Sequence, residues 1–141
     1  MTSFDCELIH FKYKYNNNDD NTSIDLTDLS IKVVNIDDIN MKATLIAPKY
    51  IETLHITYCC GNHDSINASM ISLLSHCDIN TLCIGGKAFV CSFLYIKNNY
   101  KIKKIIIKNT NETHFNKIQK MKKELSYGCI LVYENTTIEC I

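Results

Sequence analysis

The sequence predicts an α/β fold in which short parallel strands and their connecting segments stack along the chain as a repeat array. The first observation is an apolar phrase of the form apolar-x-x-apolar-x-apolar, which returns five times in 141 residues. Its copies are Leu26/Leu29/Ile31, Ile51/Leu54/Ile56, Ile79/Leu82/Ile84, Ile102/Ile105/Ile107 and Tyr127/Ile130/Val132. The second observation is their even spacing, because the copies begin 25, 28, 23 and 25 residues apart. A unit of this size cannot bury its own apolar face, so neighbouring units must bury it for one another.

The composition sets the limits of the fold and its partners. A chain of 141 residues, 46% of them hydrophobic, is sufficient for one domain with a core. The 15 basic and 15 acidic residues cancel, so no overall field attracts nucleic acid or an anionic membrane. No apolar run is long enough to cross a bilayer, and residues 1–10 lack the pattern of a secretory signal. We therefore expect a cytoplasmic protein with reduced cysteines and with neither a nucleic-acid nor a membrane partner.

The N-terminal segment, residues 1–23, is expected to form a strand or cap followed by a loop. Residues 6–15 alternate enough to form a strand, and Cys6/Ile9/Phe11 loosely repeats the apolar phrase. Residues 16–23 are a polar run of Asn, Asp, Thr and Ser. Because this run has no apolar side chains whose burial offsets the entropy of ordering, it is interpreted as a loop.

The connections between the later strands are predicted to be helices. Residues 65–77, 88–96 and 112–125 place apolar residues at helical spacing, and the last of these ends in lysines, as the helix dipole favours. The crossover between Ile31 and Ile51 has no clean period and contains Pro48, so no strand or helix is assigned to it. The resulting alternation of strands and helices suits a parallel sheet with crossover connections.

The apolar phrases resemble the strand motif of leucine-rich repeat proteins over residues 24–134, and the helical connections are similar to those of the longer repeats of that family. The family usually has Asn or Cys eight positions after the first apolar residue. That position holds Val34, Cys59, Lys87, Thr110 and Asn135 in the five copies, so only Cys59 and Asn135 conform. The alternative is an ordinary doubly wound α/β domain.

The resemblance implies one domain over residues 1–141. It would be a leucine-rich-repeat solenoid of about five repeats, with the parallel sheet on the concave face and the helices on the convex face. Residues 135–141 would form a C-terminal tail or cap. The Asn-, Ile- and Lys-rich composition is similar to that of small repeat proteins of poxviruses, which implies a viral protein that modulates a host partner.

In leucine-rich repeat proteins the residues between the apolar ones form a concave recognition surface. Carried over to this chain, the resemblance implies a protein-binding face without catalysis. Its residues would be His55, Cys83, Lys104, Ile106, Lys108, Leu131 and Tyr133. The apolar members near the C-terminus mark a contact site, either for a partner protein or for self-association through the C-terminal repeats. The alternative is that the tail, residues 136–141, folds back and covers them.

One loop has the residue types of a thiol-dependent enzyme. Cys59, Cys60 and His63 lie between a predicted strand and a predicted helix N-terminus, where a thiolate is stabilised and a histidine can act as base. A small α/β enzyme centred on these residues is therefore the alternative function. A structural role is favoured, because Cys59 occupies the position where the resembled family has Cys and Asp64 is a natural helix cap. No catalytic residue is assigned.

Other chemistry is not supported by the spacing. The potential zinc ligands lack the paired Cys-x2-Cys arrangement of a structural site, so no metal or other cofactor is expected. These residues are Cys59, Cys60, His63, His76, Cys77 and Cys83. The segment 85–87, Gly-Gly-Lys, lacks the full phosphate-loop spacing, and close packing of strand against helix accounts for its glycines. Acidic residues in the first third and lysines in the last third make the chain dipolar, which is interpreted as solvation rather than steering of a partner.

Overall fold

The computed structural model describes residues 4–12, 23–39, 44–57, 66, 68–125 and 128–134. Within these ranges the chain forms a six-stranded sheet in the order β1-β3-β5-β6-β7-β8 and a two-stranded sheet of β2 and β4. The strands are β1 (Cys6–Phe11), β2 (Ser23–Asp25), β3 (Ser30–Ile36), β4 (Thr44–Ile46), β5 (Tyr50–Ile56), β6 (Asp78–Gly85), β7 (Lys104–Lys108) and β8 (Ile130–Glu134). The helices are α1 (Ala68–His76), α2 (Gly86–Ile96), α3 (Glu112–Met121) and a 3-10 turn, η1 (Lys122–Glu124).

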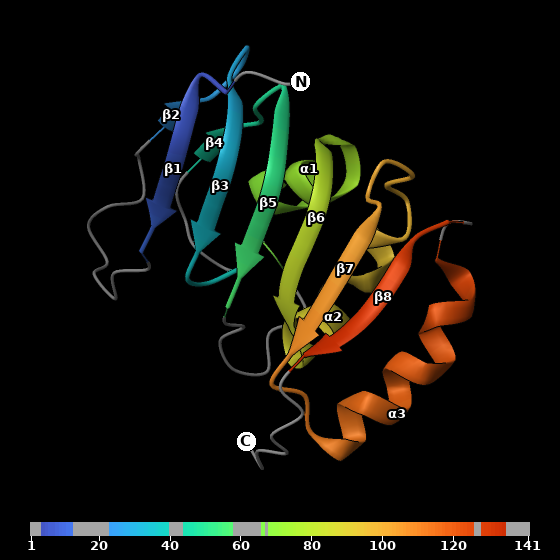
Figure 1. Cartoon of the computed structure of the whole chain (residues 1–141). Coiled ribbons are helices and arrows are strands. Elements are labelled where there is room, and N and C mark those ends of the chain that lie inside the picture. The colour runs from blue at the N-terminus through green and yellow to red at the C-terminus, as the bar shows by residue number, and fades with distance from the viewer. Residues whose placement is uncertain are drawn as a thin grey trace.

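The strands of the main sheet follow one another in chain order, and every described neighbouring pair is parallel. Helices α1 and α2 lie behind the sheet in the view of Figure 1, and α3 lies beside β8. The smaller sheet also lies behind, near β1 and β3 (Figure 1). The fold is therefore an open α/β arrangement, and the shuffled strand order of a doubly wound sheet is not found.

The central apolar phrases lie in register, as predicted. Ile51, Leu54 and Ile56 of β5 pair with Ile79, Leu82 and Ile84 of β6. Ile105 of β7 pairs with Leu82 and Ile107 pairs with Ile84, so β7 continues two of these three rows. All of these side chains are at most 1% exposed. Because inward residues of parallel neighbours stack directly on one another, the phrase builds a continuous core behind the sheet.

The first predicted copy of the phrase, Leu26/Leu29/Ile31, is wrong. The copy in β3 is Ile31/Val34/Ile36, which pairs with Ile51/Leu54/Ile56 of β5. A turn precedes β3, with Asp28 at a positive φ of 73° and the Asp25 carboxylate accepting a hydrogen bond from Thr27 N–H at 2.9 Å. This turn separates Leu26 from β3, so the copy Leu26/Leu29/Ile31 does not form a strand.

The N-terminal phrase, in contrast, is confirmed. Cys6, Ile9 and Phe11 of β1 pair with Ile31, Val34 and Ile36 of β3. The main sheet therefore has six strands, one more than the five copies that the pattern gave. Residues 13–22, which include most of the predicted polar loop, lie outside the described residues.

The crossover between Ile31 and Ile51, to which the sequence assigned no element, contains most of β3 and all of β4. Strand β4 pairs in parallel with β2, and its Leu45 is buried. The backbone N–H of Leu45 donates to Ser69 Oγ of α1 at 2.9 Å. Three residues are too few to produce a detectable period, which explains why the pattern missed this strand.

The three predicted helices are present with shifted ends. Helix α2 begins at Gly86, directly after β6 and two residues earlier than predicted. Helix α3 ends at Met121, and η1 carries the chain on to Glu124. The side chain of Asn111 caps α3 by accepting a hydrogen bond from His114 N–H at 2.8 Å.

A buried asparagine ties the helical layer together. The side-chain amide of Asn99 donates to the carbonyl oxygens of Leu74 at 3.0 Å and Cys77 at 2.8 Å. Its side-chain oxygen accepts from Lys101 N–H at 3.0 Å. Asn99 is 4% exposed, so these bonds satisfy carbonyl groups at the end of α1 that have no helical partner.

Candidate functional site

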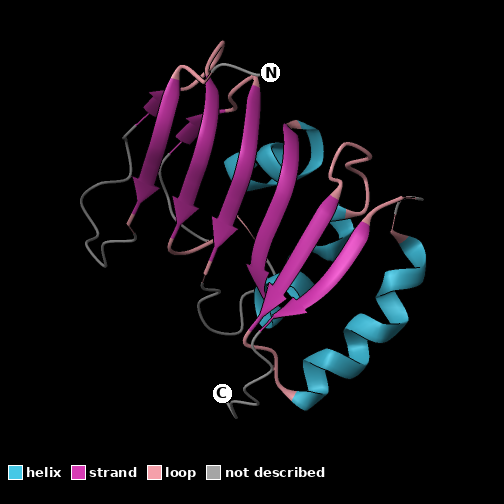
Figure 2. Cartoon of the chain, viewed as in Figure 1, coloured by secondary structure: helices cyan, strands magenta, loops and turns pink. Residues whose placement is uncertain are grey.

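The candidate site is the face of the main sheet that lies opposite the helices, called here the open face. Its side chains come from the strand positions that alternate with the buried phrase. One row across it consists of the paired residues His10, Asn35, His55, Cys83, Ile106 and Val132. A second row consists of Leu8, Val33, Thr53, Thr81, Lys104 and Ile130. In Figure 2 all described helices lie on the other side of the sheet or at its β8 end, so none of them covers this face.

Five of the seven predicted site residues share this face. His55 pairs with Cys83, and Cys83 pairs with Ile106, across three neighbouring strands. Lys104 and Lys108 lie on β7 at two-residue steps from Ile106, so their side chains project to the same side. Lys104 is exposed, His55, Ile106 and Lys108 are half-buried, and Cys83 is buried among its neighbours.

The two remaining predicted residues, Leu131 and Tyr133, lie on the opposite face, so the prediction is wrong for both. Leu131 pairs with Ile105 and Tyr133 with Ile107, which are both fully buried. The ring of Tyr133 lies 5.0 Å from the ring of Phe115 on α3, centroid to centroid. The Tyr133 hydroxyl accepts a hydrogen bond from Gln119 Nε2 at 3.0 Å.

The cause of this error is a shift of one residue in the last repeat. A shift of one position moves every side chain of a strand to the other face. Ile130, Leu131 and Val132 are all apolar, so periodicity could not show which of them points inward. The open face instead presents Ile130, which is 59% exposed, and the half-buried Val132, and the predicted site lacked both.

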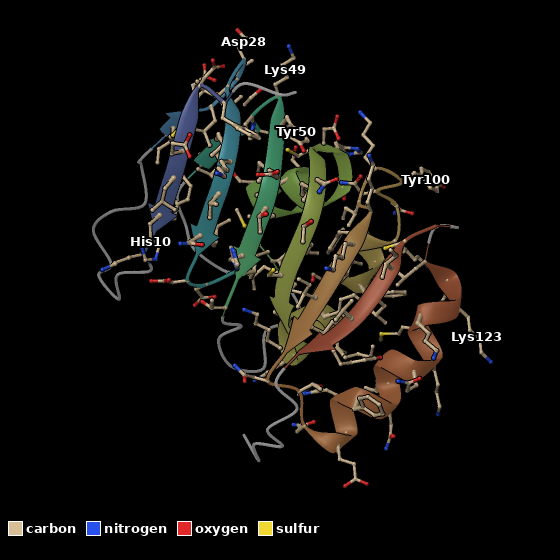
Figure 3. All side chains as sticks on the ribbon, in the orientation of Figure 1. His10, Asp28, Lys49, Tyr50, Tyr100 and Lys123 are labelled. Atoms are coloured by element: carbon tan, nitrogen blue, oxygen red, sulfur yellow. The ribbon has the colours of Figure 1, made fainter. Side chains whose placement is uncertain are left out.

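The half of the open face towards β1 combines the apolar pair Leu8 and Val33 with polar and charged side chains. Towards β1, His10 Nε2 lies 2.9 Å from Asp37 Oδ1, and Lys32 lies 3.9 Å from Glu7. Burial, and then the positive charge of Lys108, lower the pKa of His55 below its ordinary value. Figure 3 shows the side chains across this face, with His10 labelled near one end of the β1 edge.

Comparisons with known proteins identify no relative. A scan of family models, a search of curated proteins and a search of solved structures each find no match to this chain. The leucine-rich-repeat resemblance therefore stays a prediction from the sequence. Any functional assignment therefore depends on the geometry of the open face.

The alternative catalytic loop cannot be placed, because Cys59, Cys60 and His63 lie outside the described residues. Elsewhere, the thiol of Cys77 donates to the Pro48 carbonyl at 3.5 Å, and burial raises its pKa to about 12. Such a thiol is the reverse of an activated nucleophile. Cys6, Cys77, Cys91 and Cys129 are free thiols.

The described residues contain no group of three or more His, Cys, Asp or Glu side chains positioned to hold a metal ion. Nor does any helix among them have the length and apolar character needed to span a membrane.

The packing interpretation of the glycine pair is confirmed for one of the two. A Cβ atom on Gly86 would lie 2.4 Å from Thr110 Oγ1 and 2.9 Å from Thr110 Cα. At Gly85 the nearest atom would be 3.6 Å away, which is an ordinary contact. Gly86 is therefore required by the close approach of Thr110 to the start of α2, while Gly85 is not.

Proposed function

We propose that this protein is a non-catalytic binding module that recognises a partner protein through the open face. The observation that carries the proposal is a patch of Ile106, Ile130 and Val132 on the side of β7 and β8 that no described helix covers, called here the apolar patch. We further propose that the sheet is the concave surface of a short solenoid of the leucine-rich-repeat kind. The chain order of the parallel strands and the stacked apolar phrase support this.

The apolar patch is contiguous. Ile106 pairs with Val132 across the two strands, and Ile130 is the neighbour of Lys104 in the next row. Folded proteins that act alone rarely leave a large contiguous apolar surface in water, and such surfaces commonly mark contact sites. Burying the patch against a partner would stabilise the complex through the hydrophobic effect.

The surroundings of the patch indicate the chemistry of the partner. Lys103 and Lys104 are exposed beside it, and Lys108 follows on the same face of β7. A partner segment with apolar side chains flanked by carboxylates matches this distribution. Because a hydrogen-bonded sheet is already ordered, docking costs little conformational entropy on this side of the complex.

The sequence-based expectation of a cytoplasmic viral protein with a host partner is kept as part of this proposal. It rests on the composition and on the resemblance, and the open face adds the kind of surface that such a partner would need.

The test is affinity capture from a cell lysate with three forms of the protein. The site variant is Ile106→Asp/Val132→Asp, which places charges in the apolar patch. The control is Leu94→Asp, because Leu94 is 62% exposed on α2, on the helical side of the sheet. We expect proteins that bind both the wild type and the control to be lost from the site variant.

Identical sets of captured proteins for all three forms would contradict the proposal. Circular dichroism of each variant shows whether the sheet and helices are retained, so a loss of binding can be separated from a loss of folding. Loss of the same proteins from the Leu94→Asp control alone would move the binding surface to the helical side.

A further inference from the structure

The two ends of the main sheet carry strands that have a neighbour on one side only. In the described part of the chain β1 pairs only with β3, and β8 pairs only with β7. An unpaired strand edge is a template for pairing with another chain, and proteins usually cover or disrupt it. Helix α3 lies beside β8 in Figure 1, yet each edge strand has a large apolar side chain in contact with water: Leu8 in β1 is 57% exposed and Ile130 in β8 is 59% exposed.

The inward side chains of both end strands are also incompletely buried. Ile9 and Phe11 in β1, and Leu131 and Tyr133 in β8, are half-buried, whereas their equivalents in the inner strands are at most 1% exposed. The inner strands reach full burial because each has a neighbour on both sides. Within the described residues, each end of the sheet therefore lacks the contacts that one more strand would supply.

The register of the sheet shows that β1 has the right pattern to follow β8. If the parallel register continued beyond β8, the next strand would place Leu8 beside Ile130, Ile9 beside Leu131 and Phe11 beside Tyr133. Exposed apolar residues would meet on the open face, and half-buried ones would meet on the helical face.

The charges at the two ends are complementary. Near β1 the described acidic residues outnumber the described lysines, although Glu7 lies beside Lys32 and Asp37 beside His10. The acidic residues are Asp5, Glu7, Asp25, Asp28 and Asp37, and the lysines are Lys12, Lys32 and Lys49. The end around β7, α3 and β8 is rich in lysine, including Lys103, Lys104, Lys120, Lys122 and Lys123. Figure 3 shows Asp28 and Lys123 at opposite ends of the molecule. Contact between two β1 edges or two β8 edges would bring like charges together, so the pairing of unlike ends is favoured.

We propose that the protein self-associates head to tail, with β8 of one copy pairing in parallel with β1 of the next. A head-to-tail contact uses two different surfaces, so each copy can bind one neighbour at either end. The main sheet would then run from copy to copy without a break in its register. This inference goes beyond partner binding. Ile130 belongs to both surfaces, but Leu8 lies at the end of the sheet opposite the apolar patch, so Leu8→Lys separates self-association from partner binding.

The test is sedimentation velocity of the full chain over a dilution series. The variants are Leu8→Lys, which places a charge at the β1 edge, and Ile130→Lys, which does so at the β8 edge. Leu94→Lys is the matched control, because Leu94 has a similar exposure on α2 and belongs to neither edge. We expect the mean mass of the wild type and the control to rise with concentration, and each edge variant alone to stay a monomer.

A mixture of the two edge variants gives the sharpest result. The Leu8→Lys copy retains an intact β8 edge and the Ile130→Lys copy retains an intact β1 edge. The mixture should therefore form dimers and stop there, although neither variant associates alone.

A wild type that stays a monomer at every concentration would overturn the proposal, and this result does not depend on how the variants fold. Association of Leu8→Lys alone at the wild-type level would also overturn it, because that outcome requires a contact without β1.

Discussion

The N-terminal and C-terminal halves of the main sheet are built with different connections but follow the same register. In the first half, β1, β3 and β5 are connected through the short strands β2 and β4. In the second half, β5, β6, β7 and β8 are connected through α1, α2 and α3. The difference teaches that the inward apolar phrase sets the register, while a connection only has to supply apolar side chains to the back of the sheet.

The open face differs between the same two halves. Towards β1 it combines polar and charged side chains, among them His10 within 2.9 Å of Asp37, with the apolar pair Leu8 and Val33. Towards β8 it carries the apolar patch and the lysines of β7. The backbone arrangement is the same throughout, so the proposed binding surface in the second half is distinguished by its three clustered apolar side chains and by the lysines beside them.

The largest expected effect is a loss of stability when a core side chain behind the sheet is removed, and it is compared between helix α2 and strand β4. Phe89 of α2 is fully buried, so Phe89→Ala should lower the free energy of unfolding by about 3–5 kcal/mol through loss of burial and creation of a cavity. Leu45→Ala in β4 removes fewer atoms, at a site that is 6% exposed, and should cost about 2–3 kcal/mol. Urea denaturation of both variants measures the difference. A larger loss for Leu45→Ala would show that the short strands carry more of the stability than the helices.

The next largest expected loss of stability comes from removing the side-chain hydrogen bonds of Asn99 in the helical half. Asn99→Ala removes two hydrogen bonds to buried carbonyl groups and should lower the free energy of unfolding by about 2–3 kcal/mol. Asn98→Ala is the matched control, because the Asn98 side chain makes one exposed bond to the Leu94 carbonyl at 3.0 Å. It should cost about 0.5 kcal/mol or less. Equal losses in urea denaturation would mean that Asn99 does not tie α1 to the loop before β7.

A smaller loss of stability is expected at the junction where β6 continues directly into α2, since β6 ends at Gly85 and α2 begins at Gly86. The described N-terminal half has no strand that continues directly into a helix. Gly86→Ala forces a methyl group against Thr110 and should cost about 1–3 kcal/mol by overpacking. Gly85→Ala meets only ordinary contacts and should be close to neutral. Thermal unfolding of the two variants provides the comparison. A neutral Gly86→Ala would show that Thr110 moves away without cost.

The smallest effect is a pH dependence to which both halves contribute. The pKa of His55 is lowered by burial and then by Lys108, and that of His114 by burial and then by Lys117 and Lys87. A histidine whose pKa is lowered by folding binds its proton more readily in the unfolded chain. Stability is therefore unaffected well above pH 6.5 and decreases as the pH falls from 6.5 through the lowered pKa.

Replacing either histidine should weaken this loss of stability on acidification. Urea denaturation above and below pH 6.5 measures it for His55→Gln, His114→Gln and the double variant, which should show the weakest dependence. An unchanged pH dependence in the double variant would contradict the assigned causes.

The sequence predicted the central part of the sheet correctly because the spacing of apolar residues there fits one choice of inward positions only. Ile51/Leu54/Ile56 and Ile79/Leu82/Ile84 alternate with polar or small residues, so their inward positions were identified correctly. Near Leu26 the phrase fits two overlapping sets of residues, Leu26/Leu29/Ile31 and Ile31/Val34/Ile36. The turn at Asp28 excludes the first set from the strand, and the sequence pattern alone does not show this turn. Strand β4 was missed because its three residues are held by pairing with β2, which is a tertiary contact.

The candidate site was predicted in part for the same reason. Ile106 lies between two inward isoleucines, and the phrase placed it correctly on the open face. In the run from Ile130 to Val132 each residue suits either face, and the packing of Tyr133 against Phe115 settles the choice. Asn99 gave no signal, because an asparagine after a predicted helix is also typical of an ordinary helix end.

The register of β8 is the central claim, since it decides which side chains the open face offers to a partner. Nuclear Overhauser effects between the methyl groups of isoleucine, leucine and valine test it directly. The structure predicts cross-peaks between Ile106 and Val132 and between Ile105 and Leu131. A cross-peak between Ile106 and Leu131, with none between Ile106 and Val132, would place Leu131 on the open face and contradict the account.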